Sequence, residues 1–144
     1  MEPAGYSGTP LARKLGLKDG QAVAFVGLPD GLVWLTTVAA FRRVDVVDDW
    51  RGLSGEDWDV IHLFTRSAAE VDAALPVLRG RIAQSGMIWV SWPKKASKVA
   101  TDVTEDTIRN RALADVLVDI KVCAVDEVWS GLKLVIRRTE RKGV

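Results

Sequence analysis

Short apolar runs alternate with stretches of helical spacing along most of the chain. The apolar runs predict strands over residues 21–26, 43–47, 60–64 and 87–92, followed by two more over 118–125 and 132–137. Turns rich in Gly and Pro follow several of these runs, and helical patterns over 32–40 and 68–82 lie between them. This alternation of strands and helices is typical of an α/β domain with a mostly parallel sheet.

Three of the predicted helices have recognisable ends or faces. Thr9 is the expected cap of a short first helix that begins with Pro10. The helix over 68–82 has a core-facing stripe of Val71, Leu75, Leu78 and Ile82. Pro76 lies inside that helix and predicts a kink or an interruption. In the last helix, Asp102 is the expected cap and Glu105 reaches back to it. The residues expected to point inward from the last helix are Ile108, Ala112 and Leu113.

The last two strands are joined by residues 126–131, which are few enough for a β-hairpin. Helical crossovers make the earlier strands parallel. This order resembles the Rossmann-like methyltransferase fold, in which the final strand inserts antiparallel. One strand–helix unit of that fold is missing, which gives six strands in the expected order 2-1-3-4-6-5. We therefore expect one three-layer α/β domain over 1–144, with an N-terminal helical arm (1–17) and a loose tail (138–144).

Composition narrows the function classes without selecting one. Lys and Arg number 20 against 19 acidic residues, so no overall field favours a nucleic acid partner. No apolar run reaches the ~18 residues of a membrane span, and the N-terminus lacks a signal-peptide pattern, so we expect a cytoplasmic protein without membrane contact. His62 and Cys123 are the single residues of their kinds, both inside strands. They predict a hydrogen-bonded core histidine and a buried thiol, with no metal site and no catalytic residues.

The turn after the first strand is where a parallel sheet of this kind binds its ligand. The residues of this turn are Gly27, Leu28, Pro29, Asp30 and Gly31. Methyltransferases carry a run of glycines here, whereas Leu28 adds bulk and Pro29 removes an amide donor. Asp48 and Asp49, which end the second strand, match the ribose-binding position of that family. We interpret the two glycines as turn residues and predict no cofactor, with S-adenosylmethionine as an alternative to test.

The segment after the fourth strand is basic. Lys94, Lys95 and Ser97 are suited to bind a phosphate or carboxylate, and Arg66 from the neighbouring strand is expected to converge on them. The alternative is a solvated basic loop, or an ion pair with the acids of the hairpin. The predicted ligand-binding residues are Lys94, Lys95, Ser97, Arg66, Ser67, Gly27, Asp30, Gly31, Asp48, Asp126 and Trp129.

Two long motifs resemble an uncharacterised bacterial family of small domains of unknown function. One is Trp-Val-Ser-Trp-Pro-Lys-Lys at 89–95. The other is Lys-Val-Cys-Ala-Val-Asp-Glu at 121–127 followed by Trp-Ser-Gly-Leu-Lys at 129–133. The resemblance spans nearly the whole chain, but it implies no activity, ligand or catalytic residue.

Three functions remain open at this point. The preferred one is a non-catalytic Rossmann-like module that binds a small anionic or nucleotide-like ligand at the carboxyl edge of the sheet. The second is a protein-interaction or self-associating module with Trp50, Trp58 or Trp129 as exposed anchors. The third is a divergent methyltransferase that uses S-adenosylmethionine.

Overall fold

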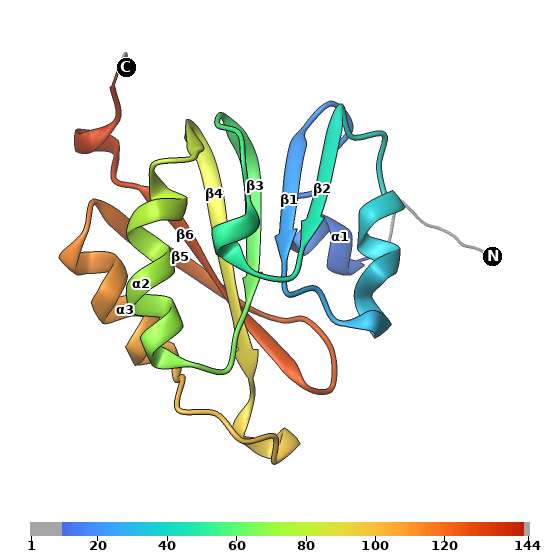
Figure 1. Ribbon diagram of the computed structural model, residues 1–144, viewed down its shortest axis with the longest axis vertical. Coiled ribbons are helices and arrows are strands. Elements are labelled where there is room, and N and C mark those ends of the chain that lie inside the picture. Colours follow the sequence, from blue (N-terminus) through green and yellow to red (C-terminus); the bar gives the residue numbers. More distant parts are fainter. Residues whose placement is uncertain (1–9, 143–144) are drawn as a thin grey trace.

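The computed structural model describes residues 10–142, which form one twisted six-stranded sheet with helices on both faces (Figure 1). The strands are β1 (Ala22–Val26), β2 (Arg43–Val47), β3 (Trp58–Phe64), β4 (Ile82–Pro93), β5 (Leu117–Ala124) and β6 (Trp129–Ile136). Their order in the sheet is β2-β1-β3-β4-β6-β5. β1 to β4 are parallel, and β6 runs antiparallel between β4 and β5. The predicted α/β fold and strand order are confirmed.

The helices divide between the two faces. The α-helices are α1 (Pro10–Lys14), α2 (Ala68–Arg79) and α3 (Glu105–Ala114). The 3-10 helices are η2 (Asp30–Thr37), η3 (Trp50–Gly52), η4 (Lys95–Ser97) and η5 (Arg138–Glu140). α2 and α3 cover one face of the sheet, and α1 and η2 lie on the other (Figure 1). The predicted cap Thr9 lies outside the described residues.

β4 contributes to the core on both sides of the sheet. Val90 and Trp92 pack in the cluster beneath α2 and α3, and Trp89 packs in the cluster beneath α1 and η2. The indole Nε1 of Trp89 donates a hydrogen bond to the Leu15 carbonyl at 3.0 Å, which ties the chain just after α1 to the sheet. Trp58 is fully buried, with the Arg43 guanidinium 3.7 Å from the centre of its ring. The expectation that Trp58 is an exposed anchor is therefore wrong.

The segment predicted as a helix over 32–40 is the 3-10 helix η2. The hydroxyl of Thr36 donates to the Val33 carbonyl at 2.8 Å, and that of Thr37 donates to the Trp34 carbonyl at 3.3 Å. Such side-chain bonds compete with the backbone bonds of an α-helix, and β-branched residues also disfavour it. These local preferences explain the tighter helix.

α2 ends at Arg79, so Ile82 belongs to β4 and not to the helical stripe predicted for it. α2 continues through Pro76. A proline leaves the carbonyl four residues earlier without its helical partner. That carbonyl belongs to Asp72, and the Arg111 Nε of α3 donates to it at 3.5 Å. A neighbouring helix therefore meets the acceptor that Pro76 leaves free.

The N-terminus of α3 differs from its predicted form. Thr104 is the cap: its hydroxyl accepts the Thr107 amide at 3.2 Å, and its own amide donates to the Thr107 hydroxyl at 3.1 Å. The predicted cap, Asp102, accepts the Ala68 amide at 2.7 Å and so closes the first turn of α2 instead. Leu113, expected to point inward, is exposed.

His62 and Cys123 lie in the core as predicted. The His62 Nε2 lies 2.7 Å from the Ser91 hydroxyl, and its ring stacks on Phe64 with centroids 4.1 Å apart. Burial lowers the pKa of His62 to about 3, so the ring is neutral. Burial raises the pKa of the Cys123 thiol, although the charges of Lys14 and Lys121 oppose that shift.

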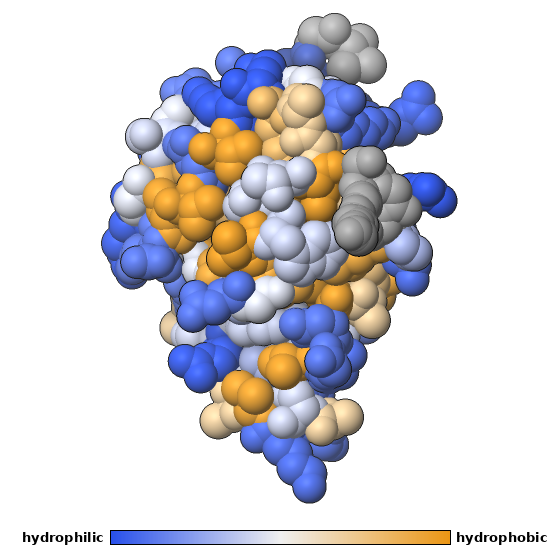
Figure 2. Space-filling view, turned by 90° about the vertical axis from the view of Figure 1, so that its right-hand side faces the viewer, coloured by the Kyte–Doolittle hydropathy of each residue, from blue (hydrophilic) through white to orange (hydrophobic). Residues whose placement is uncertain are grey.

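The outer side of β2 and η2 carries exposed apolar groups. Figure 2 shows this side of the molecule, where apolar groups gather near the centre and hydrophilic ones surround them. Val33 and Trp34 of η2 and Val46 of β2 are among the large apolar residues that are exposed. No helix within residues 10–142 has the length and hydropathy needed to cross a membrane.

Candidate functional site

A cavity of about 380 Å³ opens at the carboxyl ends of the paired strands β1 and β3, where the connections that follow them lead in different directions. We call it the edge pocket. Its lining residues are Gly27, Pro29, Phe64, Thr65, Arg66, Glu70, Val99, Val128 and Trp129. Clefts of this size at this point of an open α/β sheet are the usual ligand sites of such folds.

Gly27 forms the turn by which the chain leaves β1. Its φ is +71°, and a Cβ added to it would lie 2.9 Å from the Phe64 carbonyl oxygen, so only glycine fits. Its amide donates to the Val47 carbonyl at 2.8 Å and is therefore not free for a ligand. Gly31, by contrast, has open space around its Cβ position. Gly27 is thus the glycine that the close packing of β1 against β3 requires.

A hydrogen-bonded turn fixes an acidic group in the edge pocket. The Thr65 hydroxyl accepts the Ser67 amide at 3.1 Å and donates to the Glu70 carboxylate. The Ser67 hydroxyl in turn caps α2 by accepting the Glu70 amide at 3.2 Å. Glu70 was not among the predicted site residues. The Ser-x-x-Glu spacing of a helix N-terminus was the signal that could have found it.

Arg66 supplies the positive charge of the same pocket. Its carbonyl accepts bonds from the Thr101 hydroxyl at 2.9 Å and the Asp102 amide at 3.3 Å, so its backbone is fixed. Its exposed side chain forms no ion pair with an acid of residues 10–142. The edge pocket therefore presents one cation and one anion, Arg66 and Glu70, that do not neutralise each other by direct contact.

The hairpin between β5 and β6 closes the aromatic side of the edge pocket. Phe64 and Trp129 meet edge to face, with centroids 5.3 Å apart and planes at 88°. An oxygen of Asp126 accepts the amides of Val128 and Trp129, both at 2.8 Å. Asp126, predicted as a ligand-binding residue, is thus engaged in shaping the hairpin, and among the described residues it forms no ion pair with Lys94 or Lys95.

The two acids after β2 differ in their contacts. Asp49 caps η3 by accepting the Arg51 amide at 2.8 Å, and it pairs with the Arg51 guanidinium at 3.2 Å. The exposed carboxylate of Asp48 has no partner within the described part of the chain. The Asp48 carbonyl lies 3.9 Å from the Cβ position of Gly27, so the backbone of this acid is next to the turn that lines the edge pocket.

The basic loop lies beside a second cavity, of about 570 Å³, which we call the loop pocket. Its lining residues are Trp92, Pro93, Lys95, Lys98, Val99, Ala100, Thr101, Val103, Thr104 and Glu105. Val99 lines both cavities, so they adjoin. The Ser97 hydroxyl donates to the Lys94 carbonyl at 2.7 Å and accepts the Val99 amide at 3.2 Å, so it is engaged in holding the loop.

The predicted ligand-binding residues therefore do not form one cluster. The edge pocket includes Gly27, Arg66 and Trp129, and the loop pocket includes Lys95. Those that line neither cavity are Lys94, Ser97, Ser67, Asp30, Gly31, Asp48 and Asp126. Lining residues absent from the prediction include Phe64, Glu70 and Val128 of the edge pocket and Trp92, Lys98 and Val103 of the loop pocket.

Comparison with solved structures shows which proteins share this fold. Magnesium protoporphyrin IX methyltransferase from Synechocystis PCC 6803 with bound S-adenosylhomocysteine superposes with a TM-score of 0.63 at 13% identity, covering 87% of this chain and 78% of that chain. Its S-adenosylmethionine form gives 0.64 at 14% identity, with coverages of 88% and 74%. The ribosomal protein L11 methylase from Lactobacillus delbrueckii subsp. bulgaricus superposes with a TM-score of 0.64 at 13% identity, covering 89% of this chain and 77% of that chain. No family model and no curated protein matches the sequence.

These structures correct two interpretations made from the sequence. A non-catalytic module without a cofactor was preferred because the turn after β1 lacks a glycine run. Proteins of the same fold include methyltransferases, and one of them is solved both with S-adenosylmethionine and with its demethylated product, which overturns the preference for a module without a cofactor. The ligand position is created where the connections after β1 and β3 separate, and this geometry is present here with Gly27 alone at the close contact. The chain has the Rossmann-like α/β fold of methyltransferases.

Proposed function

We propose that this protein is a divergent methyltransferase that binds S-adenosylmethionine in the edge pocket. The observation that carries the proposal is the pair of unneutralised charges, Arg66 and Glu70, in a cavity at the position where parallel sheets bind ligands. The amino acid end of S-adenosylmethionine has one carboxylate and one ammonium group. Arg66 binds the former and Glu70 the latter.

The rest of the cofactor has complementary groups nearby. Asp48 lies just beyond β2, and its carboxylate, unpartnered within residues 10–142, is suited to accept hydrogen bonds from the two ribose hydroxyls. Phe64 and Trp129 supply apolar surface within the pocket. The Thr65 hydroxyl holds Glu70 in place by donating a hydrogen bond to its carboxylate. Because this hydroxyl is already engaged within the turn, it is not needed as a donor to the cofactor.

The chemistry that the cofactor supplies when bound is an electrophilic methyl group. In the overall reaction the nucleophilic atom of the acceptor forms a bond to the methyl carbon while the carbon–sulfur bond breaks, the electron pair stays on sulfur, and the acceptor proton passes to solvent. The protein contributes by holding the two reactants close together, which is the main requirement of such a transfer.

Calorimetric titration with S-adenosylhomocysteine and with 5′-methylthioadenosine tests the proposal. The second compound lacks the amino acid end, so the wild type is expected to bind it about tenfold or more weakly, as loss of a charged hydrogen bond predicts. Arg66→Ala and Glu70→Gln are expected to reduce this preference without lowering the melting temperature. A wild type that binds neither S-adenosylmethionine nor S-adenosylhomocysteine would refute the proposal.

A further inference from the structure

The loop pocket has an apolar floor. Trp92 and Val103 belong to the hydrophobic cluster beneath α2 and α3, and both are largely buried where they border the cavity. Pro93 and Val99 extend this surface, and Val99 also borders the edge pocket. A ring or branched aliphatic group can therefore be buried next to the position proposed for the methyl donor.

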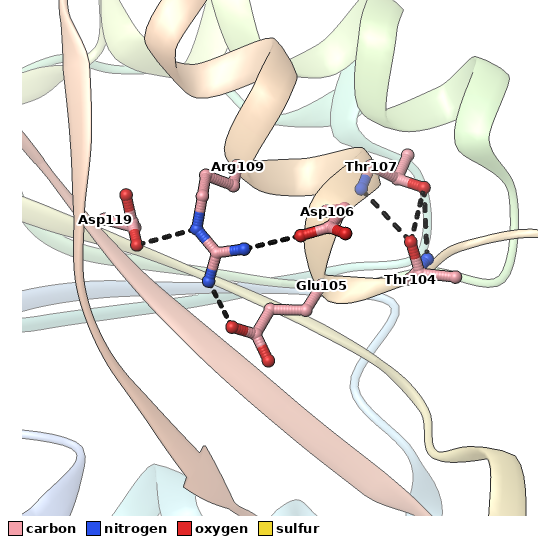
Figure 3. Close-up of polar contacts among 6 residues, drawn as sticks. All are labelled: Thr104, Glu105, Asp106, Thr107, Arg109 and Asp119. Atoms are coloured by element: carbon pink, nitrogen blue, oxygen red, sulfur yellow. Dashed lines mark hydrogen bonds and ion pairs between the residues drawn. The ribbon is translucent and has the colours of Figure 1, made fainter.

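The charges around this floor are predominantly positive. Lys95 and Lys98 line the pocket, and neither forms an ion pair with an acid of residues 10–142. The one acid among the lining residues, Glu105, is paired with Arg109, which also binds Asp106 at 2.6 Å and Asp119 at 3.0 Å (Figure 3). Hydrogen bonds to Asp119 and Glu105 raise the pKa of Arg109, so the partner of Glu105 stays charged. The two lysines are thus left as the uncompensated charges of the pocket.

Hydrogen bonds and ion pairs hold the part of the loop pocket that α3 contributes. Figure 3 shows the Thr104–Thr107 bonds that cap α3 and the Arg109 cluster beside them. Thr104 and Glu105, the first residues of this part, line the loop pocket. A cavity with a fixed wall needs less ordering when a ligand binds, which favours affinity.

Lys98 is held in a backbone conformation that lysine seldom adopts. Its φ is +62° and its ψ is 13°, in the left-handed region, and its amide donates to the Lys95 carbonyl at 3.1 Å. Glycine adopts this conformation without the steric penalty that a Cβ brings. Residues held in such sparsely populated backbone conformations cluster at functional sites, and Lys98 lines a cavity.

We propose that the loop pocket binds the methyl acceptor, and that the acceptor is an amphipathic anion. Its aromatic or branched aliphatic body packs on Trp92 and Val103, and its carboxylate or phosphate pairs with Lys95 and Lys98. The acceptor role rests on the function proposed above. The binding of such an anion to the pocket does not.

Four small probes separate the two halves of the proposed recognition. Phenyl phosphate and benzoate carry a ring and an anion, benzyl alcohol carries only the ring, and inorganic phosphate carries only the anion. Titration of the ¹⁵N-labelled full chain, followed by the Trp92 indole and the Val103 and Thr101 amides in NMR spectra, gives a Kd for each. We expect the two amphipathic anions to bind about fivefold or more tightly than the other two probes, because both contacts contribute. The ratio of phenyl phosphate to benzoate then tells which head group the lysines prefer.

Three variants locate the site. Lys95→Ala and Lys98→Gly are each expected to weaken the amphipathic anions by about three- to tenfold. Lys94→Ala is the matched control, since this neighbour does not line the pocket, and it is expected to leave the Kd unchanged. Lys98→Gly is further expected to raise the melting temperature by about 3 °C, since it relieves the left-handed backbone. Weaker binding in a more stable protein cannot be the result of damage to the fold.

Several outcomes would overturn the inference. If benzyl alcohol bound as tightly as the amphipathic anions, the lysines would have no part in recognition. If inorganic phosphate bound as tightly, the apolar floor would have none. An equal loss in Lys94→Ala would move the site out of the loop pocket. Titration of the same sample with S-adenosylhomocysteine separates the two proposals. If the probes bind but S-adenosylhomocysteine does not, only the acceptor role is refuted. If S-adenosylhomocysteine binds but the probes do not, only the binding of an amphipathic anion in the loop pocket is refuted.

Discussion

The imidazole of His62 and the hydroxyl of Ser91 form a hydrogen bond of 2.7 Å between β3 and β4, where neither side chain contacts solvent. Phe64 stacks on the imidazole, and Phe25 and Trp89 lie near it. No acid lies among these contacts to stabilise an imidazolium. The ring is therefore neutral, and protonation is disfavoured in the folded state.

Acidification is expected to destabilise the protein through this histidine. The pKa of His62 is about 3 when folded and 6.5 when exposed, so between these values the unfolded chain binds the proton that the folded one excludes. The free energy of unfolding should fall by about 2 kcal/mol from pH 7.5 to pH 5, above the range in which most carboxylates titrate. Urea unfolding at both pH values measures it. A His62→Gln variant should lack most of this fall, and an equal fall in that variant would contradict the assignment.

Substitutions at two glycines with positive φ distinguish the cost of backbone strain from the cost of a steric clash. Gly20, at φ +86°, has open space at its Cβ position, whereas a Cβ on Gly27 would meet the Phe64 carbonyl at 2.9 Å. Gly20→Ala is expected to cost about 1 kcal/mol, and Gly27→Ala about 2–4 kcal/mol, because it adds displacement of β3 to the strain. Chemical denaturation of both variants provides the comparison. Similar losses would show that β3 moves aside at little cost.

Of the two acids after β2, Asp48 is expected to bind the ligand and Asp49 provides the matched control. Asp48→Ala is expected to weaken the binding of S-adenosylhomocysteine about tenfold while leaving the melting temperature unchanged, because its carboxylate has no partner among residues 10–142. Asp49→Ala removes the cap of η3 and should cost about 1 kcal/mol of stability with little change in the Kd. Calorimetry and thermal unfolding of both variants test this. The reverse pattern would place the ribose elsewhere.

Cys123 is expected to react slowly with thiol reagents. It is buried in β5, and burial raises the pKa of its thiol, so little thiolate is present at pH 8. Its rate with an aromatic disulfide should be about tenfold or more below that of the same protein in urea. Rapid modification of the folded protein would show that β5 opens readily.

The order of the strands followed from the sequence because apolar runs and turns are local signals. The ends of the helices did not follow, because contacts from elsewhere in the chain determine them. Asp102 has the composition of a cap, but its carboxylate bonds Ala68 of another helix, and Thr104 takes its place. That α2 continues without interruption through Pro76 could not be foreseen for the same reason, since the Arg111 contact that accompanies it comes from α3.

The candidate site could be predicted in part. Gly27 and Arg66 were found because strand ends gather at one edge of a parallel sheet. Glu70 was missed because its position in the pocket depends on the Thr65 turn, which bends the side chain back toward the strand. Lys98 was missed because no sequence pattern indicates that a lysine adopts a left-handed backbone.

The bond from the Trp89 indole to the Leu15 carbonyl joins residues that are 74 positions apart. α1 has only five residues, too few to persist alone, so it forms when its docking surface exists. That surface includes Trp89 and Phe25, which β4 and β1 bring together. We therefore expect α1 to dock late in folding, so that its contacts slow unfolding more than they speed folding. On this view the docking of α1 and Leu15 on the sheet lengthens the lifetime of the native state.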